Sequence, residues 1–158
     1  MTEQKINNTY EYDEQYEILI VNLVRLCGRI GKKIEQFPYI HRKNLGDQLN
    51  RSSSSVPSNL EEGRGRSYLG AVRDEGQFLH YALGSAREAK VQLLMCCSTG
   101  LIKETQKRNA IKVLVEAIEF TEGRLTLISK DGYSKSQYKK IVDANGLDNE
   151  DPNSEDWD

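Results

Sequence analysis

Residues 48–66 read Gln-Leu-Asn-Arg-Ser-Ser-Ser-Ser-Val-Pro-Ser-Asn-Leu-Glu-Glu-Gly-Arg-Gly-Arg, and this polar run decides the fold. The apolar residues Leu45, Leu49, Val56 and Leu60 recur at spacings that place them on one face of a helix. Amides, hydroxyls and carboxylates lie on or beside that face. Because polar groups at such depth need hydrogen-bond partners, the run predicts a helix that is bonded to its neighbours through polar side chains.

A predicted polar network joins this helix to the one that follows it. Its members are Gln48, Arg51, Ser55, Asn59, Glu62, Ser85 and Glu88. Inside a bundle these groups could satisfy one another, with Arg51 neutralising a glutamate. Alternatively, part of the network lies between subunits, where buried polar groups can fix the number of copies that associate.

Two helices are predicted in the first half of the chain, one before the polar run and one that contains most of it. Over residues 16–37 the apolar positions recur every three or four residues, and Pro38 ends that helix. A second helix is expected from about residue 41 to 63. Because Pro57 removes a backbone donor and crowds the carbonyl of Ser53, this helix is predicted either to kink near Ser53 or to consist of two pieces.

The second half of the chain predicts two more helices. The Gly-Arg-Gly-Arg run at 63–66 is read as the turn into a third helix over about 69–98, on which Gly76 and Gly84 would let a neighbour approach closely. Gly100 then supplies a left-handed stop before a fourth helix that ends near residue 131. The predicted buried residues of the third helix are Val72, Leu79, Ala82, Ala86, Ala89, Leu93 and Cys96. Those of the fourth helix are Ile111, Leu114, Ile118, Thr121, Leu125 and Ile128.

The predicted fold class is all-α. Four helices joined by short loops pack best as an antiparallel up-down-up-down bundle. A chain of 158 residues suffices for one domain with a core. The expected organisation is a polar N-terminal segment at 1–14, the bundle at 15–132, and an acidic, disordered C-terminal tail at 133–158.

The formal net charge of −2 conceals an asymmetry along the chain. All 22 basic residues lie at or before Lys140, whereas seven of the 24 acidic residues follow it, and residues 18–140 carry a net charge of +9. A basic body with an acidic tail suits a polyanionic partner. The alternative is an ordinary solvated surface followed by a disordered tail.

Three groups of basic residues are candidates for contact with nucleic acid. Guanidinium and ammonium groups bind phosphates, and the aromatic ring of Tyr68 could stack on a base. The candidates are Arg25, Arg29, Lys32 and Lys33, near Arg42 and Lys43; Arg64, Arg66 and Arg73; and Lys103, Lys107 and Arg108, with Lys112. Each group alone is also consistent with a solvated helix face.

The residues quoted above, together with Phe78-Leu79 and Gly84-Ser85-x-x-Glu88, carry a family resemblance. Over roughly residues 16–130 the chain resembles the four-helix-bundle family named for the 23S rRNA intervening sequence. The accessory bundle proteins of diversity-generating retroelements are similar to that family. The resemblance implies a ring-shaped homo-oligomer, commonly a pentamer, with no established enzymatic activity.

Catalytic and metal chemistry are not expected. A bundle di-iron site needs two Glu-x-x-His pairs, but neither His41 nor His80 has a glutamate three residues earlier. A serine nucleophile would lack the strained turn and the oxyanion donors of acyl transfer. Cys27, Cys96 and Cys97 lie at apolar helical positions and are expected to be reduced packing residues, so no metal and no cofactor is predicted.

The sequence therefore predicts a non-enzymatic oligomer located in the cytoplasm, since no signal core or membrane-spanning stretch is present. It would bind RNA or DNA through repeated Arg and Lys contacts with phosphates, and scaffold a reverse transcriptase or another nucleoprotein complex. The alternative hypothesis is a purely structural or protein-binding oligomer that does not bind nucleic acid.

Overall fold

The computed structural model describes residues 3–68 and 72–128, and within these ranges the chain is helical, with no strand. Four long helices make up the fold: α1 (Glu3–Glu35), α3 (Asp47–Tyr68), α4 (Val72–Ser98) and α5 (Glu104–Ile128). A one-turn helix, α2 (Tyr39–His41), and a π-helical segment, η1 (Arg42–Gly46), connect α1 to α3. The predicted tail at 133–158 lies outside the described residues.

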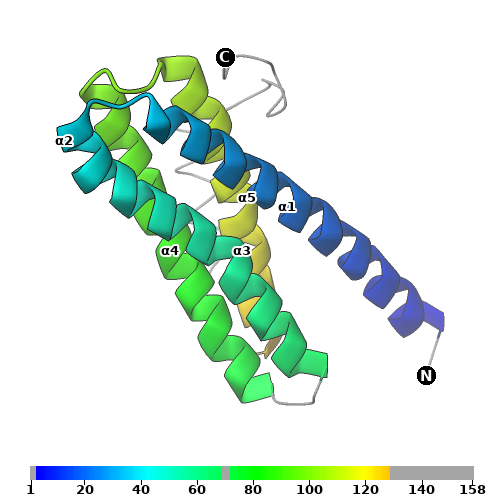
Figure 1. Cartoon of the computed structure of the whole chain (residues 1–158). Helices are drawn as coiled ribbons and strands as arrows, with labels where there is room; N and C mark the ends of the chain where they lie inside the picture. The colour runs from blue at the N-terminus through cyan, green and yellow to red at the C-terminus, as the bar shows by residue number, and fades with distance from the viewer. Residues whose placement is uncertain (1–2, 69–71, 129–158) are drawn as a thin grey trace.

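The long helices surround one apolar core. Helix α3 lies along α4, α4 lies along α5, and α1 packs on both α3 and α5, while its first turns extend past the other helices (Figure 1). The side chains of Leu23, Val56, Leu60 and Leu114 are completely buried between these helices. The all-α prediction is confirmed.

Helix α1 buries the predicted apolar stripe from Tyr16 to Ile34. The helix begins much earlier than that stripe, at Glu3. This extension is possible because an existing helix gains one hydrogen bond for each residue added, even where no apolar face is present. At the other end, the amide of Phe37 donates to the Ile34 carbonyl at 3.0 Å, and Pro38 follows as predicted.

The corner between α1 and α3 depends on Gly46. A Cβ atom at this position would lie 2.8 Å from Cγ2 of Ile34, so α1 and the end of η1 approach more closely than any other residue would permit. The predicted close approaches at Gly76 and Gly84 are wrong, because a Cβ atom at either glycine would meet nothing within 4 Å. Gly84 is exposed, whereas Gly76 is buried but has space for a Cβ atom.

Helix α3 passes through Pro57 as one helix, so the predicted split does not occur. Proline cannot donate to the carbonyl of Ser53, and that carbonyl instead accepts a hydrogen bond from the Cys27 thiol of α1 at 3.3 Å. The serines on either side bond back to carbonyls one turn earlier. Ser54 Oγ donates to Asn50 at 2.8 Å, and Ser58 Oγ donates to Ser54 at 3.0 Å.

The turn predicted at residues 63–66 is also wrong, because α3 continues to Tyr68. Gly63 is a packing position in the helix. A Cβ atom there would lie 3.4 Å from Cβ of Phe78 and 3.5 Å from the Glu75 carbonyl of α4. The small residue brings α3 and α4 together; it does not end the helix.

The predicted stop at Gly100 is confirmed by its φ of +74°. The amide of Leu101 donates to the Cys96 carbonyl at 2.9 Å, which closes the end of α4. The amide of Lys103 donates to Oε1 of the buried Gln106 at 2.9 Å and so caps the start of α5. The predicted stripes of α4 from Leu79 onward and of α5 up to Leu125 are buried.

Candidate nucleic-acid interface

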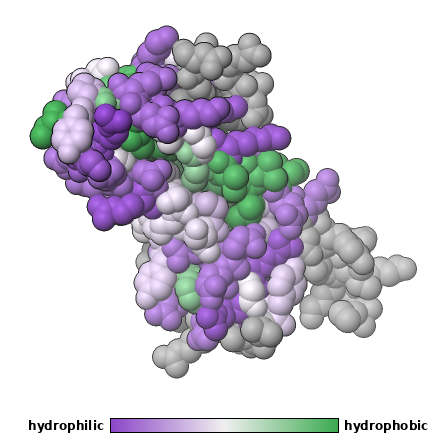
Figure 2. All heavy atoms as spheres, in the orientation of Figure 1, coloured by the Kyte–Doolittle hydropathy of each residue, from purple (hydrophilic) through white to green (hydrophobic). Residues whose placement is uncertain are grey.

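Two of the three predicted basic groups meet at one end of the molecule. The last turns of α1, the α2–η1 corner and the turn from α4 into α5 lie together there (Figure 1). We call this region the basic end; its cations are Arg29, Lys32, Lys33, Arg42, Lys43, Lys103, Lys107, Arg108 and Lys112. In the same segments, 29–47 and 103–112, only Glu35, Asp47 and Glu104 are acidic. In Figure 2 the corresponding lobe is mostly hydrophilic, with a small hydrophobic area at its outer edge.

Several ammonium groups of the basic end lie at its surface. Lys32, Lys43 and Lys103 are exposed. Lys33 Nζ donates to Oε1 of Gln36 at 3.0 Å, and Lys107 Nζ lies 2.5 Å from Oε1 of Glu104. The hydrogen bond from Lys107 lowers the pKa of Glu104, so this carboxylate is ionised beside the lysines. Lys32, Lys43 and Lys103 thus present exposed positive charge to an anionic ligand.

Arg64 and Arg66 lie toward the other end of α3, and both interact with other residues of the same chain. Nη1 of Arg64 lies 2.5 Å from Oε1 of Glu17 on α1, and its guanidinium stacks 4.3 Å from the ring centroid of Tyr16. Burial opposes the charge of Arg64, but hydrogen bonds to Glu17 and Tyr68 raise its pKa above the ordinary value. This arginine therefore fastens α3 to α1.

The remaining predicted basic residues lie apart from the basic end. Arg66 forms an ion pair with Glu62 one turn earlier at 2.6 Å. Arg73 belongs to the first turn of α4, and its side chain lies outside the described residues. Arg25 is exposed on α1, next to an apolar strip described below. The structure thus separates the predicted candidates into one cluster and several outliers.

The predicted polar network is assembled only in part. Ser85 Oγ donates to Ser55 Oγ at 3.0 Å, and Asn59 Nδ2 donates to the same hydroxyl at 2.8 Å. Gln48, Arg51 and Glu62 lie on the surface instead; Arg51 Nε donates to the carbonyl of Asp47 on its own helix. Polar contact between α3 and α4 thus involves fewer of these residues than predicted.

A second polar link between α3 and α4 uses two residues that the predicted network omitted. Buried Ser52 hydrogen-bonds Oε1 of buried Gln92, and Nε2 of Gln92 donates to Glu88 at 3.0 Å. Ser52 lies three residues after Leu49 and four before Val56, so its spacing placed it on the buried face. That spacing was the signal in the sequence.

A buried ion pair joins two residues that lie 49 positions apart in sequence. Glu75 of α4 is 3% exposed, and its Oε1 lies 2.5 Å from Nε of Arg124 on α5. Nη2 of Arg124 also donates to Ser67 of α3 at 3.1 Å. Nothing in the local sequence pattern connects these residues, because they are brought together only by the packing of three helices.

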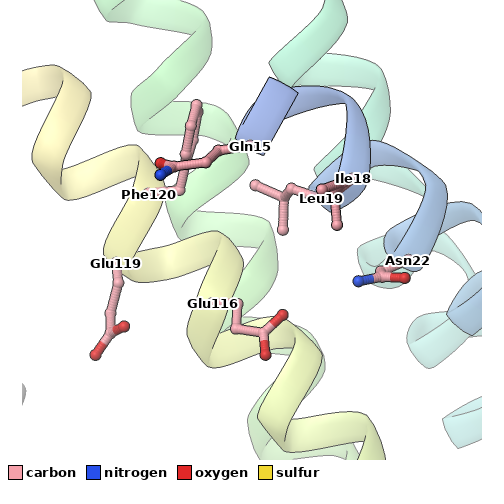
Figure 3. A pocket seen from close by; sticks show the side chains of 7 residues that line it. All are labelled: Gln15, Ile18, Leu19, Asn22, Glu116, Glu119 and Phe120. Atoms are coloured by element: carbon pink, nitrogen blue, oxygen red, sulfur yellow. The ribbon is translucent and has the colours of Figure 1, made fainter. Parts of the chain in front are cut away.

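The outer face of α1 carries an apolar strip, made of Ile18, Val21 and Val24, which are 56%, 45% and 57% exposed. Beside it a shallow groove of about 260 Å³ lies between α1 and α5 (Figure 3). The groove is lined by Gln15, Ile18, Leu19, Asn22, Glu116, Glu119 and Phe120. Burial raises the pKa of Glu116. Apolar surface of this kind is typical of a protein contact.

The three cysteines are free thiols in packing positions. Burial, with the neighbouring Cys97, raises the pKa of Cys96 to about 11, which makes that thiol a poor nucleophile. Among the described residues, no three His, Cys, Asp or Glu side chains gather closely enough to hold a metal ion. The described helices include none with the length and apolar character needed to cross a bilayer.

The fold and the basic end define a class of protein, a four-helix all-α protein with a cationic end. Residues 21–123 match the family model of the 23S rRNA-intervening sequence protein, and the chain belongs to this family. The resemblance seen in the sequence is therefore confirmed. No curated protein matches the chain.

Proposed function

We propose that this protein is a non-enzymatic, self-associating accessory protein that binds RNA or DNA through the basic end. The observation that carries the proposal is that the segments bearing two basic groups, far apart in sequence, meet at one end of the molecule and contain few carboxylates. Phosphates would be held by Lys and Arg contacts with little reading of base identity. The family name, which refers to ribosomal RNA, is consistent with a nucleic-acid partner.

The proposed assembly is a ring of bundles with up-down-up-down topology, commonly five in this family. A ring repeats the basic end once per subunit, so weak contacts together give strong, salt-sensitive binding. Such a particle could scaffold a reverse transcriptase or another nucleoprotein enzyme. We assign it to the cytoplasm, because three free cysteines used for packing suit a reducing compartment.

Fluorescence anisotropy of a labelled RNA hairpin, measured between 50 and 200 mM salt, tests this function. Lys43→Gln should weaken binding and reduce the slope of log K against log salt by about 0.7–1, the value of one phosphate contact. Arg66→Gln, at the other end of α3, is the control and should leave the slope unchanged. No binding of hairpin, single strand or duplex by the wild-type protein at 50 mM salt would rule out the function.

The second candidate function is a structural or protein-binding oligomer, which the apolar strip of Ile18, Val21 and Val24 favours. Affinity purification from a cell extract with and without nuclease separates the two functions. A nucleic-acid scaffold should lose its co-purifying proteins after nuclease treatment, whereas a protein-binding oligomer should retain them.

A further inference from the structure

The corner between α1 and α3 exposes two large apolar side chains within the basic end. Tyr39 and Ile40 are 70% and 71% exposed, although the corner is anchored in the core by buried apolar residues before and after them. Phe37 precedes them and is 4% exposed, and Leu45 follows at 9%. Isolated apolar side chains on a surface are common, but an exposed aromatic ring among cations is a feature of nucleic-acid grooves.

The corner holds the backbone at Tyr39 in a fixed conformation. The amides of His41 and Arg42 donate to the Pro38 carbonyl at 2.9 and 3.0 Å, and Pro38 itself restricts the backbone before the ring. The π-helical segment that follows is anchored by the close contact of Gly46 with Ile34. Only the side-chain torsions of Tyr39 then remain to be ordered when a ligand binds.

Cations lie on both sides of this ring along the chain. Lys43 follows Tyr39 by four residues, which is about one helical turn, so both project from the same side of the corner. Lys32 and Lys33 occupy the last turn of α1 immediately before the corner. Segments of π-helix, such as the one that carries Lys43, are rare and occur frequently at functional sites.

We propose that Tyr39 is a stacking platform for an unpaired base, with Lys43 and the last turn of α1 holding the phosphates beside it. The inference rests on the proposed function and specifies its ligand: single-stranded or looped RNA or DNA. In a continuous duplex the faces of the bases are already occupied by their neighbours, whereas an unpaired base presents a free face to an aromatic ring.

The test compares binding of a twelve-nucleotide single-stranded RNA and a blunt RNA duplex by wild-type protein and by Tyr39→Ala and Tyr39→Phe. Tyr39→Ala should lose roughly tenfold in affinity for the single strand, the usual loss for one stacked base, and less than about twofold for the duplex. Tyr39→Phe keeps the ring and should bind as the wild type does. Tyr81→Ala removes a tyrosine that is 51% exposed on α4 and serves as the matched control.

The salt dependence separates stacking from charge. Tyr39→Ala removes no cation, so its affinity should fall without a change in salt slope, whereas Lys43→Gln should flatten the slope. Equal losses for single strand and duplex, or no loss for either, would overturn the stacking role while leaving the proposed function intact. A change in native mass with unchanged binding would overturn it too, because Tyr39 would then be a contact between subunits. Failure of the wild-type protein to bind either RNA would refute the proposed function itself.

Discussion

At the scale of single residues, small side chains and a thiol decide how the helices meet. Gly46 admits Ile34 at the α1–α3 corner, and Gly63 admits Phe78 between α3 and α4. The Cys27 thiol bonds the Ser53 carbonyl that Pro57 leaves without its usual donor. The two glycines allow close packing of the helices, and the thiol supplies a hydrogen-bond donor that the proline removes.

Gly46→Ala is expected to destabilise the protein by about 1–3 kcal/mol, because the added methyl group would overlap Cγ2 of Ile34. Gly84→Ala is the matched control: nothing lies within 4 Å of its Cβ position, so this change should stabilise α4 by about 0.5–1 kcal/mol. Urea unfolding followed by circular dichroism measures both. A Gly46→Ala variant as stable as the wild type would contradict the close packing of the corner.

Because the Cys27 thiol bonds the Ser53 carbonyl that Pro57 leaves without a donor, we expect substitutions of Cys27 and Pro57 to have coupled effects on stability. Cys27→Ala should cost about 1–2 kcal/mol, and less in a Pro57→Ala background, where residue 57 again donates to the Ser53 carbonyl. A double-mutant cycle by urea unfolding should give a coupling of about 0.5–1 kcal/mol. Cys27→Ser retains a donor as the control. If the changes in unfolding free energy caused by the two substitutions simply add, the thiol contributes packing alone.

At the scale of elements, charged side chains join neighbouring helices. Arg64 joins α3 to Glu17 of α1, and Arg124 of α5 joins Glu75 of α4 and Ser67 of α3. The Glu75–Arg124 pair is the more buried of the two. Loss of one partner there leaves the other charge within the protein, which costs more than the loss of a surface pair.

Glu75→Gln is therefore expected to destabilise the protein by roughly 2–3 kcal/mol, because Arg124 would keep a largely buried charge. Glu62→Gln breaks the exposed pair with Arg66 and should cost less than about 0.5 kcal/mol. Thermal unfolding of the two variants at one protein concentration compares them directly. Equal effects would mean that the buried pair contributes no more than the surface pair.

The sequence predicted those elements whose signal is local. The apolar stripe of α1, the stop at Gly100 and the core positions of α5 depend on spacing within one helix, and all three predictions hold. The turn predicted at residues 63–66 failed because a glycine that ends a helix and one that packs against a neighbour look alike in sequence. Only the position of Phe78 distinguishes them.

The candidate site, like the fold, could be predicted only where its signal lies within one stretch of sequence. Cations grouped along α1 and at the start of α5 were visible in the sequence, but that these two groups adjoin, and that Arg64 is engaged by Glu17, depends on helix packing. The Glu75–Arg124 pair had no sequence signal, since its partners share neither a helix nor a periodic pattern.

At the scale of the whole molecule, two surfaces have different character. The basic end gathers cations from α1, η1 and α5, whereas the strip of Ile18, Val21 and Val24 presents apolar side chains on the outside of α1 (Figure 2). The first suits a polyanion and the second suits a protein surface. A self-associating protein could use both at once.

Val21→Glu places a charge within the apolar strip and is expected to lower the native mass measured by sedimentation, because a carboxylate there disfavours apolar contact between copies of the chain. Helical content should not change, because the side chain is 45% exposed in the protomer. Leu127→Glu, which alters an apolar residue that is 75% exposed on α5, is the control. An unchanged mass for Val21→Glu would show that the strip is not a subunit contact.

The most direct test of the basic end as the binding surface is ultraviolet crosslinking to RNA that contains 4-thiouridine, followed by mass spectrometry of the crosslinked peptides. Crosslinks are expected within segments 29–47 and 103–112, which meet at that end. Crosslinks confined to the peptides that carry Arg64 and Arg66 would contradict the assignment.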